Sequence, residues 1–253
     1  MFKNKRQNDI YKFLLKDGEV KTKELCQIFG VSDMTIRRDL DQLTNMQGVI
    51  RTYGGALYAE NMASRKFGAE QISMSNAKER IAKKALTLLE NGQRLFLDSG
   101  TTTMYVAKEF SKESECIVLT NNLRVVEKIS DCPLVSVIVI GGPLRKGTLS
   151  CYGSQTEEQI RYYNMDIAFL GASAIGSDGC IYDGYPPEAG VKKSIIASSR
   201  KVYVLVDSTK FNKFNLIMYS NVQDVTGIIT DSGIDMQTYE KLKSQGCNII
   251  IAE

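Results

Sequence analysis

The chain contains no histidine, and this absence excludes several kinds of site. Without imidazole there is no Ser-His or Cys-His nucleophilic catalysis, no histidine acid–base chemistry and no histidine metal ligand. The six cysteines are scattered without a Cys-x-x-Cys pair, so neither a zinc ribbon nor a disulfide framework is indicated. We therefore expect six reduced, mostly buried thiols, and no metal, cofactor or catalytic residue.

Long apolar runs and nucleotide-binding glycine motifs are missing as well. The N-terminal residues do not resemble a signal peptide, and no run of about 18 apolar residues could cross a bilayer. The spacings GxxxxGK[ST] and GxGxxG are absent, which excludes a P-loop and a dinucleotide fingerprint. We expect a cytoplasmic protein with no membrane partner.

The positive charge is concentrated at the front of the chain. Residues 1–57 carry ten Lys and Arg against seven Asp and Glu, whereas the remaining residues carry 22 of each. At 253 residues the chain can form a small domain and a larger one, each with its own core. A modest basic excess on the small domain fits a nucleic-acid partner.

The segment 31–40 reads as the start of a short helix that exposes paired arginines. Ser32 is placed to cap this helix, and Ile36, Leu40 and Leu43 share one narrow apolar face. Met34, Arg37, Arg38 and Asp41 point to the other side, which gives a cationic face suited to a DNA groove.

The preceding residues predict two more helices. Ile10, Phe13 and Leu14 recur at helical spacing before Gly18, which ends that helix. Thr22 is expected to cap a second helix over 23–29, whose buried side is Leu25, Ile28 and Phe29. Gly30 supplies the turn to the third helix, so the pattern is a helix-turn-helix.

A β-prone stretch follows at 49–56 and ends in a glycine pair, as in the wing of a winged helix-turn-helix. The alternative to a DNA-binding domain is a small helical subdomain with a solvated charged face. On the DNA hypothesis, the candidate contacts are Thr22, Ser32, Met34, Thr35, Arg37, Arg38, Arg51 and Tyr53.

Periodicity lapses after Tyr58, and we predict a winged-helix domain over 3–58, a linker over 59–75 and a second domain over 76–253. From Ala77 onward, amphipathic helices alternate with short apolar strands, which is typical of a largely parallel sheet covered by helices on both faces. Helices are expected at 78–89, 102–110, 123–129, 155–162, 188–198 and 236–244, and strands at 94–98, 116–120, 135–140, 166–171, 201–207, 225–230 and 247–251.

Polar residues follow several of these strands, at the sheet edge where ligands bind in such folds. Glycine, hydroxyl groups and free N–H groups at a helix start can hold an anion, and Asn side chains can bind sugar hydroxyls. For any single loop, however, an N-cap is an equally good explanation. Taken together, the loops favour a phosphorylated small molecule.

Both halves resemble one family, the DeoR family of bacterial transcription regulators. The VSxxTIRRDLxxL run stands at 31–43, and the RxxGGA signature at 51–56. In the second domain, the matching segments are 79–82, 98–102, 120–122, 141–142 with Arg145, Gly153, Asp166 with 171–172, Glu188 with 191–192, and 207–211.

The resemblance implies a sensor domain of α/β, ribose-5-phosphate isomerase-like fold that binds a sugar phosphate, in a homo-oligomer that represses a sugar-metabolism operon. By carry-over, the segment 99–102 and Lys210 would receive the phosphate, and Asp98, Asn121, Asn122 and Glu188 would face the sugar. Lys210 could instead pair with a surface carboxylate. The implied ligand residues are Asp98, Ser99, Gly100, Thr101, Thr102, Thr120, Asn121, Asn122, Gly141, Gly142, Arg145, Glu188, Asp207 and Lys210.

Two alternatives stand beside this reading. An active sugar-phosphate isomerase fused to a DNA module could use Asp98, Glu188, Asp207 and Lys210, but the isomerase's own acidic and glycine-rich lysine motifs are absent. An architectural DNA binder would show no ligand effect. The segment 182–187, with two tyrosines and two prolines, either shapes sugar specificity or forms a stiff surface turn.

Overall fold

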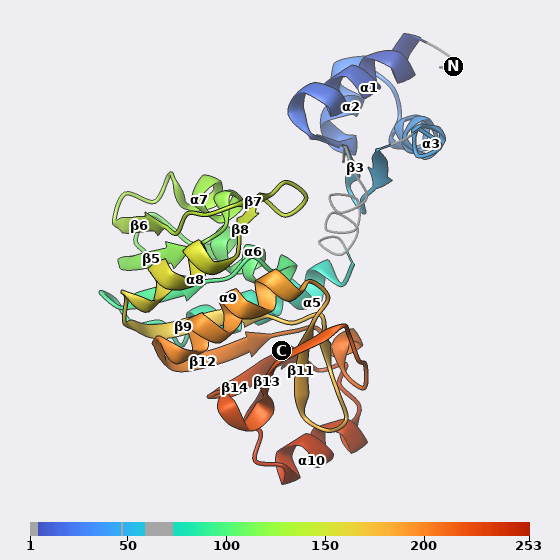
Figure 1. Ribbon diagram of the computed structural model, residues 1–253. Helices are drawn as coiled ribbons and strands as arrows, with labels where there is room; N and C mark the ends of the chain where they lie inside the picture. The colour runs from blue at the N-terminus through green and yellow to red at the C-terminus, as the bar shows by residue number, and fades with distance from the viewer. Residues whose placement is uncertain (1–4, 47, 59–72) are drawn as a thin grey trace. The chain divides into compact units, whose positions relative to one another are not determined.

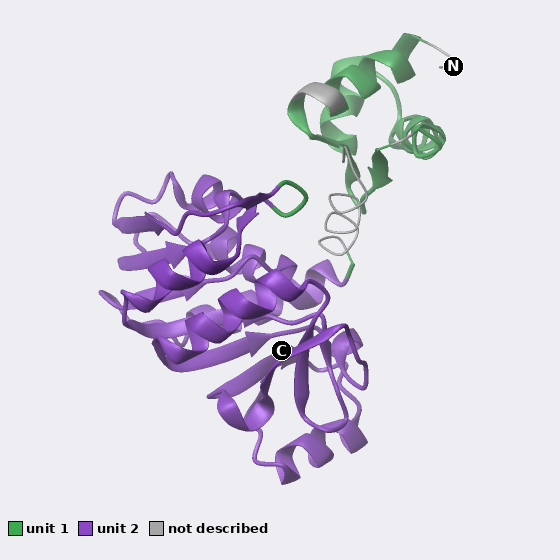
Figure 2. Ribbon diagram, in the orientation of Figure 1, with its two compact units in different colours: residues 1–73, 146–148 green, residues 74–145, 149–253 purple. Residues whose placement is uncertain are grey.

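The computed structural model describes residues 5–46, 48–58 and 73–253 (Figure 1). They form two compact units, residues 1–73 with 146–148, and residues 74–145 with 149–253 (Figure 2). The predicted linker 59–75 falls mostly on 59–72, which lie outside the described residues. Its last residue, Ser75, already begins a helix.

The first unit is a three-helix winged fold. Ile10, Leu14, Leu25, Ile36 and Leu40 are buried together in one core, which confirms the predicted apolar faces of the first and third helices and the burial of Leu25 in the second. A three-stranded sheet completes the unit, in the order β1-β3-β2 with antiparallel pairing. Its elements are α1 (Lys5–Asp17), β1 (Glu19–Lys21), α2 (Thr22–Phe29), α3 (Asp33–Leu43), β2 (Val49–Arg51) and β3 (Gly55–Tyr58).

Glycines shape the turns of this unit. Gly30 ends α2 at φ 62°, the left-handed conformation that glycine adopts without strain, and Ser32 caps α3 by accepting the Thr35 N–H. Gly55 matters for another reason: a Cβ there would lie 1.8 Å from the carbonyl oxygen of Val20. Gly55 thus lets β3 close on β1, a strand that the sequence did not predict.

Two expectations for α2 were wrong. Ile28 is exposed rather than buried, because α2 packs mainly through Leu25. Thr22 does not cap the helix: it is the first residue of α2, and its buried hydroxyl has no hydrogen-bond partner among the described residues.

The second unit is built on a parallel sheet of seven strands, in the order β15-β14-β12-β9-β4-β5-β6. All of their pairings are parallel, as the helix–strand alternation predicted. The strands are β4 (Arg94–Leu97), β5 (Cys116–Thr120), β6 (Val135–Val139), β9 (Met165–Gly171), β12 (Ser199–Leu205), β14 (Gly227–Asp231) and β15 (Ile249–Ala252).

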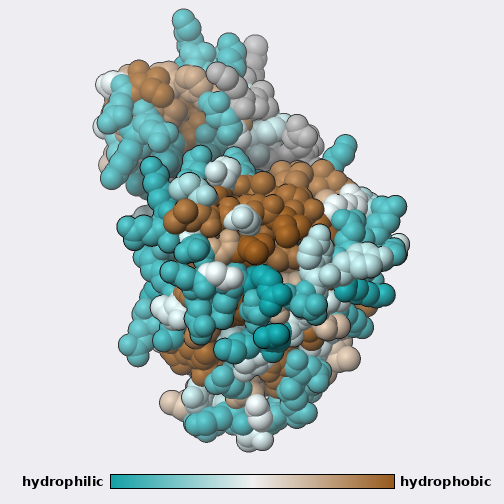
Figure 3. Space-filling model, turned by 90° about the vertical axis from the view of Figure 1, so that its left-hand side faces the viewer, coloured by the Kyte–Doolittle hydropathy of each residue, from teal (hydrophilic) through white to brown (hydrophobic). Residues whose placement is uncertain are grey.

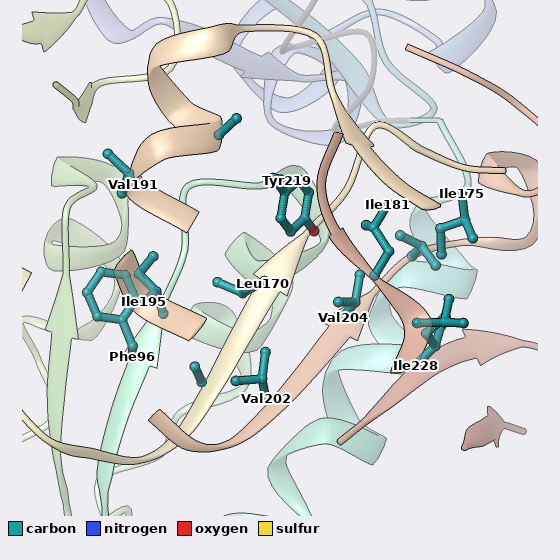
Figure 4. Packing of buried hydrophobic residues seen from close by; sticks show 14 of the residues in the cluster. Phe96, Leu170, Ile175, Ile181, Val191, Ile195, Val202, Val204, Tyr219 and Ile228 are labelled. Atoms are coloured by element: carbon teal, nitrogen blue, oxygen red, sulfur yellow. The ribbon is translucent and has the colours of Figure 1, made fainter. Parts of the chain in front are cut away.

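Helices cover both faces of this sheet (Figure 1). Strand β4 shows the division, since Leu95 and Leu97 join one core cluster and Phe96 joins the other. One face packs against α5 (Ser75–Leu86), α6 (Thr101–Glu109) and α7 (Leu123–Ile129), and the other against α8 (Ser154–Arg161), α9 (Pro186–Ala197) and α10 (Met236–Ser244). Figure 4 shows the second cluster, where Phe96 and Leu170 from the sheet lie near Ile195 of α9.

Several short elements were not predicted, because two to five residues carry too little periodicity. A second sheet, in the order β10-β11-β13, packs Ile175 and Ile181 into the same core, and a hairpin pairs β7 with β8. These elements are β7 (Leu144–Arg145), β8 (Ser150–Cys151), β10 (Ala174–Ile175), β11 (Cys180–Asp183), β13 (Ile217–Asn221) and the 3-10 helices η1 (Ser208–Lys210) and η2 (Val222–Asp224).

Candidate functional site

The strand order of the large sheet reverses between β4 and β9. Strands β4, β5 and β6 follow one another toward one edge, and β9, β12, β14 and β15 toward the other. Ligands of open parallel sheets bind at such a switch point, outside the carboxyl ends of the strands. Here the loops after β4 and β9 approach closely, since a Cβ on Gly100 would lie 3.2 Å from the Cα of Gly171.

Asp98 lies at this switch point, directly after β4. Its buried carboxylate accepts hydrogen bonds from the Gly171 N–H at 2.9 Å and from the Ser99 hydroxyl at 3.3 Å. Lys192 of α9 places its Nζ 3.4 Å from the same carboxylate. Asp98 is therefore held in place from both strands and from a helix.

Lys192 is a buried cation between two carboxylates. Its Nζ lies 2.5 Å from Asp183 Oδ2 and donates to the Gly171 carbonyl at 2.7 Å. Burial lowers the pKa of Lys192, but Asp183 and Asp98 outweigh it, so the pKa lies well above its usual value. The ammonium group is thus charged, and it is packed against the ring of Tyr219.

The loop after β5 supplies amide and hydroxyl groups. Thr120 donates to the Leu97 carbonyl at 2.7 Å, and the Asn122 side chain caps α7 by accepting the Arg124 N–H at 2.8 Å. Asn121 donates to the Cys151 carbonyl at 2.8 Å, whereas its buried Oδ1 has no partner in the part of the chain that the structure describes. Asn121 thus keeps one acceptor available for a ligand.

Glu188, on the first turn of α9, joins the hairpin to this region. Its carboxylate accepts hydrogen bonds from the Arg145 guanidinium at 2.9 Å and from the Ser150 hydroxyl at 2.8 Å. The backbone of Ser150 forms an isolated antiparallel β-bridge with Asn122. Burial raises the pKa of Glu188, although Lys192 and Arg145 oppose the increase. The Arg145 guanidinium also lies over the ring of Tyr185, 4.2 Å from its centroid.

Asp207 and Lys210 lie after β12, the strand next to β9. Asp207 is buried, caps η1 through the Thr209 N–H at 3.1 Å, and lies 4.0 Å from the buried Lys78 Nζ. Lys210 is half-buried and forms no ion pair with any residue that the structure describes. Its expected alternative, a surface carboxylate partner, is not seen.

Glycine and threonine occur together in the loop after β4, at the switch point, and again after β6, at the edge strand. Gly100 stands before the first turn of α6, whose leading N–H groups have no intrahelical acceptor, and Thr102 there is buried and Thr101 half-buried. Gly142 adopts φ 148°, and a Cβ there would lie 2.1 Å from the Thr156 hydroxyl. The adjacent Gly141 carbonyl accepts from that hydroxyl at 2.9 Å.

Most of the expected ligand residues thus lie at the carboxyl ends of the strands, after β4, β5, β6 and β12, and at the start of α9. Sequence reasoning assigned no role to their buried partners, although Lys192 lies in a segment that matches the family and Asp183 lies in the segment 182–187. Lys192 follows Glu188 by four residues, so the helical period could have placed both on one face. The other missed residues, Lys78, Ser150 and Asp183, gave no such local signal.

In the first unit, α3 and the wing present an exposed surface. Met34 is 79% exposed and Tyr53 at the wing 91% exposed, and Ser32 and Arg38 are exposed as well. Arg38 makes no ion pair within the described residues, whereas the exposed Arg37 pairs with Asp33 on its own helix. Thr35 is half-buried and hydrogen-bonds Ser32 at 2.9 Å.

Two of the expected DNA contacts are in different surroundings. Thr22 is buried, so its side chain does not share the exposed surface. Arg51 is held inside the unit: its Nε lies 2.7 Å from Asp41 of α3, and its Nη1 donates to the Gly55 carbonyl. Asp39 likewise ties α3 to α1, because its buried carboxylate accepts from Arg6 and from Gln7.

Comparisons with known proteins identify both units. The sequence model of the DeoR C-terminal sensor domain matches residues 73–232, and that of the DeoR-like helix-turn-helix domain matches residues 6–62. The chain belongs to the DeoR family. It is accordingly a transcriptional regulator that binds DNA through its helix-turn-helix and carries a sensor domain for a small effector.

Relatives in this family match over almost their full length. The chain is 32% identical to the glycerol-3-phosphate regulon repressor of Escherichia coli K12, over 92% of each chain. It is 30% identical to the regulator IolR of Bacillus subtilis, over 91% of this chain and 92% of the relative. The B. subtilis repressor GlcR is 27% identical, over 100% of this chain and 98% of its own length. These DeoR proteins are regulators of transcription, which removes the isomerase alternative.

Among solved structures, ribose 5-phosphate isomerase A of Methanocaldococcus jannaschii aligns at a TM-score of 0.42, with 17% identity over 56% of each chain. A similarity at this level carries no information on activity. None of the described helices is long and apolar enough to span a membrane.

Proposed function

We propose that this DeoR-family regulator represses a sugar-metabolism operon and that a phosphorylated sugar changes its affinity for double-stranded operator DNA. We further propose that residues 3–58 form the DNA-binding domain, that residues 76–253 form the sensor, and that the regulator acts as a homo-oligomer. The relatives support repression as the mode of action, since two of the three cited are named repressors.

The observation that carries the effector proposal is the chemistry at the switch point. Phosphate needs N–H and hydroxyl donors, which the first turn of α6 supplies through Thr101 and Thr102, and a cation, which Lys210 supplies. Lys210 suits this role because no carboxylate within the described residues neutralises it.

Phosphate only accepts hydrogen bonds, whereas the hydroxyl groups of a sugar also donate them and therefore need acceptors. Asn121 Oδ1 is buried without a partner in the described part of the chain, and an unsatisfied buried acceptor costs about 1–3 kcal/mol. A sugar hydroxyl that donates to it would recover that cost. Asp98 and Glu188 are anchored by neighbouring donors and can accept further hydrogen bonds from hydroxyl groups.

For DNA, the exposed face of α3 supports insertion into the major groove. Arg38 is exposed and forms no ion pair with a described residue, so its guanidinium can donate to a guanine edge or to a phosphate without first breaking such a pair. Arg51 supports the wing in our proposal rather than reaching freely for DNA, because Asp41 and Gly55 already hold it.

A ligand screen tests the effector proposal. Thermal unfolding of the full chain is measured with matched pairs of sugars and their phosphates, and only a phosphorylated sugar is expected to raise the melting temperature. Lys210→Ala should abolish the shift and leave operator binding intact, whereas Lys213→Ala, three residues on and exposed, should retain both. Equal shifts with the unphosphorylated sugar, or an unaltered response in Lys210→Ala, would remove the phosphate role.

A further inference from the structure

Strand β6 is an edge of the large sheet, and none of its own residues is charged or a proline; Pro133 and Pro143 lie outside the strand. Natural edge strands carry charges, prolines or bulges that prevent pairing with another chain. Here no charged residue occurs from 132 to 144, and β6 itself reads Val-Ser-Val-Ile-Val. The strand therefore has an uncharged edge at which the backbone of a further strand can pair.

Apolar side chains are also exposed around this edge. Leu134 before β6 is 54% exposed, Val139 at its end 44%, and Leu144 beyond it 42%. Figure 3 faces the side where Figure 1 places β6, and apolar residues gather there into a broad patch. The opposite edge, β15, contributes no such exposed residue, since its side chains are half-buried or buried.

The backbone N–H and carbonyl groups of alternate β6 residues point away from β5. The Ile140 N–H donates to the Thr120 carbonyl of the neighbouring strand at 2.8 Å. Because successive residues of a strand alternate, the N–H groups of Val137 and Val139 point away from β5. The Val135 N–H is used locally by the Cys132 carbonyl at 3.2 Å, but the Val135 carbonyl points outward with the others.

We infer that β6 pairs antiparallel with β6 of a second copy of this chain, across a two-fold axis at Val137. This register brings Val137 opposite its own copy, and lets the Val139 N–H donate to the Val135 carbonyl of the second copy. It joins the two sheets into one and covers both apolar patches. The inference rests on the homo-oligomer of the proposed function and names its surface.

The absence of charge selects the second copy. In the register centred on Val137, the uncharged run 132–142 of one copy lies opposite the same run of the other, so neither copy brings a charged side chain into the contact. A two-fold contact also suits a helix-turn-helix regulator, whose two copies bind two half-sites.

Sedimentation of the full chain, without DNA or effector, tests the surface. The unmodified chain is expected to be at least a dimer, and Val139→Lys should weaken that dimer by about 100-fold or more, because each copy would bring a lysine into the apolar contact. Leu216→Lys is the matched control: Leu216 is 71% exposed beside β13, and its replacement should change nothing. Circular dichroism verifies that both variants are folded.

Cross-linking tests the register and remains informative if Val139→Lys fails to fold. Opposed residues of a hydrogen-bonded antiparallel pair have Cα atoms about 5.5 Å apart, within the range of a disulfide. Val137→Cys should therefore form a covalent dimer under mild oxidation. Val135→Cys faces Val139 of the second copy and not itself, so it should stay uncross-linked.

The inference is overturned if the unmodified chain is a monomer, if Val139→Lys sediments as the unmodified chain does, or if Leu216→Lys alone dissociates it. Equal cross-linking at positions 135 and 137, or none at 137, overturns the register. None of these measurements involves DNA or a sugar phosphate. Their failure therefore leaves the ligand and operator tests untouched, and a failure of those tests leaves the interface standing.

Discussion

The two units hold their candidate functional residues in opposite ways. In the winged helix, Met34, Arg38 and Tyr53 are exposed on a small frame that other residues hold together. In the sensor, Asp98, Asn121 and Glu188 are buried, and each already forms at least one hydrogen bond to the backbone or to a neighbouring side chain. DNA is a large partner that meets a surface, whereas a small effector must be enclosed.

This difference predicts different costs of mutation. An exposed contact can be removed without loss of stability, so its replacement should affect binding alone. A buried polar residue of the sensor supports the fold as well as the ligand, so its replacement should affect both. The predictions below probe this contrast, from the largest expected effect to the smallest.

Lys192→Met should destabilise the sensor by about 3–5 kcal/mol, because it leaves Asp98 and Asp183 buried without their shared cation. Urea unfolding measures the loss. Lys193→Met is the matched control, since the neighbouring Lys193 is exposed, and it should be nearly neutral. If the two variants unfold alike, the buried network does not support the sensor and the contrast between the units is lost.

Arg38→Ala should weaken operator binding by about 1–3 kcal/mol without changing the melting temperature. If Arg38 reads a base, the loss will depend on one position of the operator; if it contacts phosphate, the loss will be uniform and the salt slope will decrease by about one unit. Lys12→Ala, an exposed cation on α1, serves as control. Unchanged binding in both Arg37→Ala and Arg38→Ala would remove α3 from the interface.

Asp166→Asn should lower the free energy of unfolding by about 1 kcal/mol at neutral pH, since this partly exposed carboxylate joins β9 to Arg94 of β4 at 2.7 Å. The Arg94 hydrogen bond lowers the pKa of Asp166 to about 2. A lowered pKa stabilises the fold above the unfolded value of about 4, and that contribution is lost as the pH falls through about 2. Unfolding of the two proteins should therefore converge over this range; a constant difference would contradict the ion pair.

The sequence predicted the three helices of the winged helix and its β-prone stretch at 49–56 because each has a local signal, whereas the three-residue β1 has none. The spacing of Ile36, Leu40 and Leu43 fixed the face of α3, and Gly30 and Ser32 marked its start. Ile28 and Thr22 went wrong because the packing of α2 against β1 and α3, rather than its own period, decides which side is buried.

In the sensor, the period of each long helix and strand was readable, but the pairing of distant residues was not. The Asp98 to Gly171 contact joins segments 73 residues apart, and the Lys192 to Asp183 pair depends on the unpredicted β11. The segment 182–187 is more than a stiff surface turn, because it ends β11 and starts α9 with its two prolines. Its role in sugar specificity stays a prediction.

The most direct test of the account is the affinity of the full chain for its own upstream DNA, measured by fluorescence anisotropy at low salt with and without phosphorylated sugars. We expect binding that Arg38→Ala weakens, and a change of about 5- to 150-fold when the correct sugar phosphate is added. DNA binding that no sugar phosphate alters would leave an architectural DNA binder, and no binding under any of these conditions would contradict the account altogether.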